Sequence, residues 1–126
     1  MNSSKPYALD ERTYLFAKDV AMCCKEIAYN VITVEYVKQL VRSSSSVGAN
    51  YIEANESLGK KDFAMRIKIC RKEAKESAYW LRLIQETNDS VSKDKLSQLM
   101  IEANELKKIF SAILSKAQMN SERNEE

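Results

Sequence analysis

The sequence predicts an all-α protein that folds as one antiparallel, up-down four-helix bundle. Only two glycines and one proline occur in 126 residues, while strong helix formers are plentiful, which favours long helices over a turn-rich β architecture. Hydrophobic residues make up 44% of the chain, enough to bury one core without disulfides or metals. Apolar residues recur at helical spacing in four segments joined by short connections, the pattern of antiparallel bundles.

The first helix is predicted over residues 9–29. Thr13 interrupts its apolar face near the start, and residues 30–32 form a short connection. Thr33 is the expected N-cap of the next helix, because its hydroxyl can accept a hydrogen bond from an exposed backbone N–H. The apolar face consists of Leu9, Phe16, Val20, Cys23 and Ile27.

The second helix is predicted over residues 34–55, with small side chains at its centre. Four consecutive serines, 43–46, precede Gly48 and Ala49. One interpretation is a flexible linker; the favoured one is a helix surface that a neighbouring helix can approach closely, although Ser and Gly are poor helix formers. The register positions are Val34, Val37, Val41, Ser44, Gly48, Tyr51 and Asn55, widened by Leu40, Val47 and Ile52.

The third helix, 60–87, has the clearest repeat in the chain, and Gly59 supplies the turn before it. Ser92 is the expected cap of the fourth helix, 93–119, and the polar stretch 120–126 is expected to fray. These four helices make one domain, 1–119. The repeat positions of the third helix are Phe63, Ile67, Cys70, Ala74, Ser77, Leu81 and Ile84, and those of the fourth are Leu96, Leu99, Ala103, Leu106, Phe110, Ile113 and Ala117.

Composition excludes several function classes. The chain contains no histidine, which excludes His-based triads and the Glu-x-x-His motif of di-iron bundles. It contains no phosphate-binding loop, nucleophile elbow or dinucleotide motif. A signal-peptide core and a membrane-spanning stretch are also missing from the sequence, and its three cysteines match no disulfide or zinc framework. We therefore expect a reduced, cytoplasmic protein without cofactor, metal or catalytic residues.

Three glutamates and three cysteines could each form a reactive cluster or serve only to stabilise the fold. Glu53, Glu73 and Glu76 lie on the middle helices and would bind a metal if they converged, but a solvated or hydrogen-bonded role is favoured. The cysteines 23, 24 and 70 would form a thiolate cluster if they met. Because Cys23 and Cys70 occupy core positions, filling of the core is favoured.

The third helix carries a second apolar face, which we call the outer strip. A monomeric bundle would leave this strip in water, and exposed apolar surface that includes a tryptophan typically marks an interface. We therefore predict a homo-oligomer. The outer strip consists of Met65, Ile69, Trp80 and Leu83.

Between these two faces runs a row of cations, which we call the basic stripe. A basic stripe can track phosphates by ion pairing and counterion release. The alternative is a solvated face balanced by acidic neighbours, which is favoured for one monomer because the formal net charge is only +2; an oligomeric ring would repeat the stripe. No aromatic ladder accompanies it, so base-specific reading is not expected. The basic stripe consists of Lys61, Lys68, Arg71, Lys72, Lys75 and Arg82.

Three motifs together carry a family resemblance. They are SSSVGANYIEA at 44–54, KDF at 61–63 and KEAKESAYWL at 72–81. The chain resembles the bacterial four-helix bundle family named for proteins encoded in intervening sequences of 23S ribosomal RNA genes. The resemblance covers most of the chain and is strongest in the second and third helices.

The resemblance implies a four-helix protomer in a homopentameric ring. Related proteins include the accessory variability determinant of diversity-generating retroelements, a basic pentamer that works with a reverse transcriptase and nucleic acid. This chain's mild charge departs from those strongly basic relatives. By position, Asn50, Glu53 and Glu76 are family-typical polar residues to which the resemblance assigns a structural role.

Two function classes follow. The first is a non-enzymatic oligomeric scaffold that binds RNA, DNA or a nucleic-acid-processing protein, such as a reverse transcriptase, through the basic stripe. The second is a structural or protein-interaction module without nucleic-acid binding, whose charges keep it soluble. An enzyme ranks third.

Overall fold

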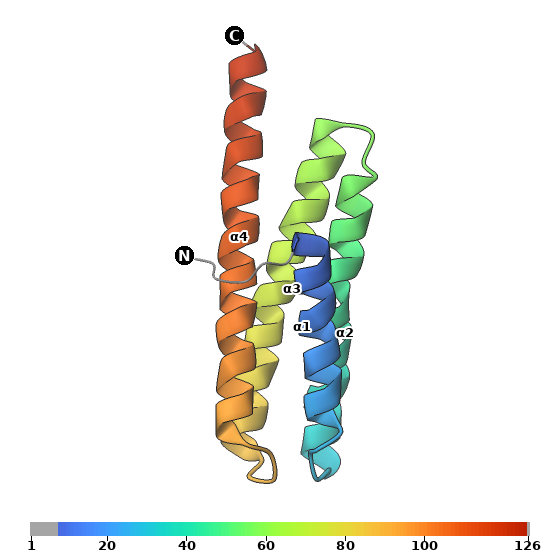
Figure 1. Cartoon of the computed structure of the whole chain (residues 1–126), viewed down its shortest axis with the longest axis vertical. Coiled ribbons are helices and arrows are strands. Elements are labelled where there is room, and N and C mark those ends of the chain that lie inside the picture. The colour runs from blue at the N-terminus through green and yellow to red at the C-terminus, as the bar shows by residue number, and fades with distance from the viewer. Residues whose placement is uncertain (1–7, 126) are drawn as a thin grey trace.

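The computed structural model (Figure 1) describes residues 8–125, and the side chains of residues 8–120. Four helices make up this part of the chain: α1 (Leu9–Cys24), α2 (Val31–Asn55), α3 (Lys60–Thr87) and α4 (Lys93–Glu125). Neighbouring helices run in opposite directions, and α1 packs against α2 and α4, diagonally opposite α3. The predicted four-helix bundle is therefore confirmed.

The first two helices meet at a different point from the one predicted. Helix α1 ends at Cys24 rather than residue 29, because the loop after α3 holds the next residues in another conformation: Ala28 N donates to Ser90 Oγ (2.8 Å), and Asn88 Nδ2 donates to Ala28 O (2.8 Å). Helix α2 begins at Val31, and its N-cap is Asn30 rather than Thr33. The Asn30 carboxamide oxygen accepts from the backbone N–H groups of residues 32 and 33, at 3.0 and 2.9 Å.

The predicted end of the fourth helix was also wrong. The sequence predicted an end near residue 119 and a frayed tail, but the helix continues to Glu125, since no glycine or proline interrupts 120–125. Residue 126 and the predicted domain start, 1–7, lie outside the described residues. Ser92 acts at the start of α4 as predicted, its hydroxyl accepting from Lys95 N at 3.3 Å.

The core contains most of the predicted register positions. The side chains of Phe16, Leu81 and Phe110 are almost completely buried in it. The small-residue centre of α2 is helical and packed, as favoured. Ser43 and Ser77 are both fully buried, and their hydroxyls lie 2.9 Å apart across the α2–α3 contact. Thr13, which interrupts the apolar pattern of α1, is buried against Gly48.

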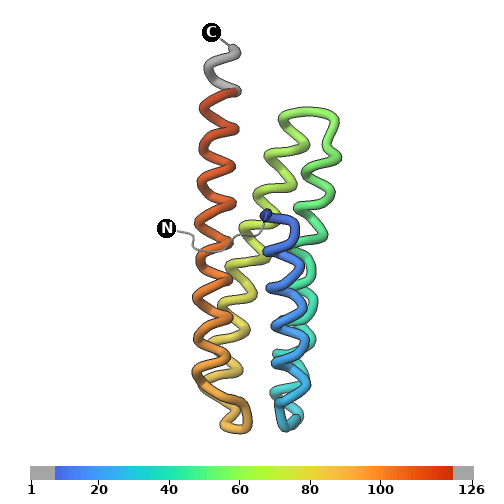
Figure 2. The backbone as a smooth tube through the Cα atoms, in the orientation of Figure 1, coloured from blue at the N-terminus to red at the C-terminus, as the bar shows by residue number. Residues whose placement is uncertain are grey.

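The bundle is uneven in length, which leaves part of α3 and α4 uncovered by α1. Helix α1 begins partway along α2, and α4 extends past the α2–α3 turn (Figure 2). The charges described next lie along the contact between α3 and α4.

Candidate functional site

A groove between α3 and α4 gathers most of the basic stripe. Its walls enclose about 400 Å³. Helix α3 contributes four cations at one- and two-turn spacing, which places them on one face, and α4 contributes Lys107 and Ser111 from the opposite wall. The lining residues are Lys68, Arg71, Lys72, Lys75, Lys107 and Ser111, and we call this site the cationic groove.

None of the five cations of the cationic groove lies within ion-pair distance of a carboxylate among the side chains of residues 8–120. Among the described side chains, the ion pairs involve other basic residues. Because the whole chain carries a formal net charge of only +2, positive charge is concentrated here while the remainder of the chain is net acidic. Such a cluster repels itself and attracts anions.

The two ends of the predicted stripe do not line the groove. Arg82 donates from Nε to Glu86 Oε2 at 2.9 Å, one turn later on the exposed side of α3. Lys61 is exposed in the first turn of α3. Sequence reasoning missed Lys107 and Ser111, because a repeat within one helix does not show which residues of another helix face it.

The outer strip is only partly exposed. Met65 is 55% exposed, whereas Ile69, Trp80 and Leu83 are half-buried. The Trp80 ring packs on Tyr36 of α2, with centroids 6.0 Å apart, and on Tyr79, with centroids 5.1 Å apart. Trp80 therefore also joins α2 to α3 within the chain, a role that the α3 repeat alone did not reveal.

The family-typical polar residues differ in their surroundings. Asn50 bridges two helices: its carboxamide oxygen accepts from Arg66 Nη1 (3.0 Å), and its Nδ2 donates to Ser46 O (2.9 Å). Glu53 is exposed, and Glu76 is half-buried. The buried carboxylate of this region is instead Glu73, which accepts from Arg42 Nη1 at 3.0 Å. These contacts are structural.

Neither the carboxylates nor the thiols form a reactive cluster. Within residues 8–120, no group of three or more Cys, Asp or Glu side chains is placed to hold a metal ion. Cys23, Cys24 and Cys70 are free and buried. Desolvation raises the pKa of Cys24 to about 11 and that of Cys70 to about 12, and it also raises the pKa of Cys23. These thiols stay protonated near neutral pH and are poor nucleophiles.

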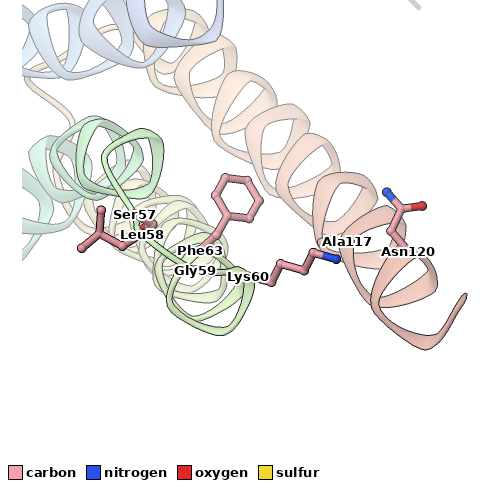
Figure 3. A pocket seen from close by; sticks show the side chains of 7 residues that line it. All are labelled: Ser57, Leu58, Gly59, Lys60, Phe63, Ala117 and Asn120. Atoms are coloured by element: carbon pink, nitrogen blue, oxygen red, sulfur yellow. The ribbon is translucent and has the colours of Figure 1, made fainter. Parts of the chain in front are cut away.

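A second recess of about 370 Å³ lies between the α2–α3 turn and α4 (Figure 3). Phe63 and Ala117 supply apolar walls, and Lys60 and Asn120 supply the polar groups at its edge. The recess contains no pair of acidic and basic groups suited to proton transfer. It is a shallow apolar hollow at the end of the bundle.

The geometry thus defines an all-α bundle whose most distinctive surface is a cationic groove. The model of the family "23S rRNA-intervening sequence protein" matches residues 9–112, and the chain belongs to this family. Among curated proteins, none matches the chain. No helix within residues 8–125 combines the length and the apolar character needed to cross a membrane.

A solved structure supports the same fold. The chain is similar to a protein with unknown function from the S23 ribosomal protein family of Bacteroides thetaiotaomicron VPI-5482, at 26% sequence identity. The alignment covers 85% of this chain and 98% of that protein, with a TM-score of 0.75.

Proposed function

We propose that this protein is a non-enzymatic oligomeric scaffold that binds nucleic acid through the cationic groove. The observation that carries the proposal is the convergence of five cations from two helices without a carboxylate partner among the described side chains. Such an arrangement costs electrostatic free energy in the free protein, and a polyanion that enters the groove relieves it.

The groove suits phosphates for geometric reasons. Lys68 and Lys75 lie two turns apart on α3, about 10 Å along the helix axis, which is long enough for two or three consecutive phosphates of one strand. Arg71 can donate two N–H groups to one phosphate, whereas the lysines act as mobile point charges. Ser111 adds a hydroxyl that can donate to a phosphate oxygen.

The non-enzymatic part of the proposal rests on the state of the reactive groups. The thiols are buried with raised pKa values, and one carboxylate oxygen of the buried Glu73 is ion-paired with Arg42. The groove itself holds only cations and one hydroxyl, and no general base lies among its lining residues. Binding and positioning are what this set of side chains supports.

We propose that the outer strip joins copies of the chain in a homopentameric ring. Met65 supports this, because it is exposed one turn before the half-buried Ile69. A closed ring would repeat the cationic groove around one assembly, so that a long polyanion could contact several grooves at once and bind more tightly through avidity.

The test combines mass and binding on one sample. Multi-angle light scattering gives the oligomeric state, and a fluorescence-anisotropy titration at several salt concentrations follows binding to mixed-sequence RNA and DNA. We expect binding that weakens steeply with salt and is abolished in the triple variant Lys68→Ala, Lys75→Ala, Lys107→Ala. Wild-type protein that binds neither polymer at low salt would refute the nucleic-acid role.

The second candidate is a structural or protein-interaction module that binds no nucleic acid. The exposed Met65 favours it, since an apolar surface fits a protein better than a phosphate backbone. If the protein is an oligomer by light scattering but binds neither RNA nor DNA in the same titration, the result would favour this candidate.

A further inference from the structure

An exposed aromatic ring stands beside the cationic groove. Tyr79 follows Lys75 by one turn and Lys72 by two on the outward side of α3, and its side chain is 59% exposed. A single exposed tyrosine is ordinary on a protein surface. It lies one helical turn beyond Lys75, a lining residue of the groove, and nucleic acids have both phosphates and aromatic base faces that these two side chains could bind.

The ring of Tyr79 packs against a neighbouring aromatic ring. Tyr79 meets Trp80 edge to face, with centroids 5.1 Å apart and an interplanar angle of 80°. Trp80 in turn packs on Tyr36 of α2, with centroids 6.0 Å apart. Three aromatic rings therefore run from the α2–α3 contact out to solvent, and the last of them, Tyr79, is the exposed one.

We infer that the groove takes single-stranded nucleic acid, with one unpaired base stacked on Tyr79 and the adjoining phosphates held by Lys72, Lys75 and Lys107. This inference rests on the proposed function and adds the strand class to it. In a duplex the base faces are hidden in the stack, so a duplex would meet only the cations. A single strand would meet both the cations and the ring.

The test measures three labelled ligands of equal length: single-stranded RNA, single-stranded DNA and a DNA duplex. The wild-type protein is expected to prefer single strands. Tyr79→Ala is expected to weaken single-strand binding by about 5- to 150-fold, the range that corresponds to removal of one base–aromatic stack, and to leave duplex binding and the salt dependence unchanged. Tyr79→Phe should retain wild-type affinity, because stacking needs the ring and not the hydroxyl. Comparison of RNA with DNA shows whether the sugar contributes.

Tyr14 provides a matched control. It is 60% exposed on α1, diagonally across the bundle, so Tyr14→Ala removes an equally exposed ring that lies away from the groove. Circular dichroism and light scattering establish that each variant keeps its fold and assembly. If Tyr79→Ala binds single strands as wild type does, or loses duplex affinity equally, the stacking inference is wrong while phosphate binding stands. If the wild-type protein binds none of the three ligands, the proposed function itself fails.

Discussion

Arg12 of α1 and Glu102 of α4 form a two-point ion pair in the interior of the bundle, with Nε–Oε2 and Nη2–Oε1 distances of 2.8 and 2.9 Å. Both residues are buried. The hydrogen bond to Glu102 is the largest cause that raises the pKa of Arg12. Because Glu102→Ala removes both of these hydrogen bonds from a buried guanidinium, we expect the free energy of unfolding to fall by about 3 kcal/mol in urea titrations.

The control for this pair removes both charges. Arg12→Met combined with Glu102→Leu places apolar groups of similar size in the same space, and should recover most of the stability, since no buried charge remains unpaired. A single Glu102→Ala variant that unfolds at the wild-type urea concentration would show that the pair contributes nothing.

Gly48 is expected to resist replacement by alanine, although alanine favours helices by about 1 kcal/mol. A Cβ atom at Gly48 would lie 3.0 Å from Thr13 Oγ1, and Thr13 is buried and donates to Asp10 O. We expect Gly48→Ala to lower the free energy of unfolding by about 1 kcal/mol. In a Thr13→Ala background, Gly48→Ala should lower the free energy of unfolding by a smaller amount. An equal decrease in both backgrounds would mean that the close contact with Thr13 is not the cause.

Lys107 and Lys108 offer a test of the groove within two adjacent residues. Lys107 lines the groove, whereas Lys108 is exposed and does not. Lys107→Ala is expected to weaken nucleic-acid binding by about three- to tenfold at low salt, and to reduce the slope of log K against log salt by about 0.7–0.9 for each phosphate that is no longer neutralised. Lys108→Ala removes the same charge from the chain and should leave both quantities nearly unchanged; equal effects would point to nonspecific attraction.

Because Cys70 is buried, the free energy of unfolding is expected to change with pH in the alkaline range. Desolvation raises the pKa of this thiol from 9.0 to about 12, so the unfolded chain releases the proton more readily than the folded one. The stabilising effect is complete below pH 9 and is lost as pH rises from 9 towards 12. We expect Cys70→Ala to show a shallower decline of unfolding free energy over this window, measured by urea titration at each pH. Identical declines in the two proteins would exclude Cys70 as the cause.

Met65 tests the outer strip. Met65→Asp places a charge where the proposed ring has an apolar contact, and is expected to shift the light-scattering mass towards the 14.4 kDa of one chain. Met22 on α1 is a matched control, because it is 51% exposed and lies outside the strip, so that Met22→Asp should keep the wild-type mass. A Met65→Asp protein of wild-type mass would place the interface elsewhere.

Much of the candidate site followed from the repeat of α3. Lys68, Lys75 and their neighbours share a face because they recur every seven residues, and an α-helix imposes that face wherever it packs. The same reasoning included Lys61 and Arg82, which the structure places outside the groove, Arg82 in an ion pair with Glu86. Periodicity identifies a face of a helix, but it does not show which part of that face meets a neighbour.

The sequence by itself determined the fold class, the number of helices and most of the core, because helix propensity and apolar spacing are local properties that burial then reinforces. The tertiary structure alone decided how those helices meet. It ended α1 at Cys24 through hydrogen bonds from the α3–α4 loop, buried Thr13 against Gly48, paired Arg12 with Glu102, and brought Lys107 to the cations of α3. Each of these contacts joins residues distant in the chain, so its partner is set by the packing of whole helices and not by the residues around it.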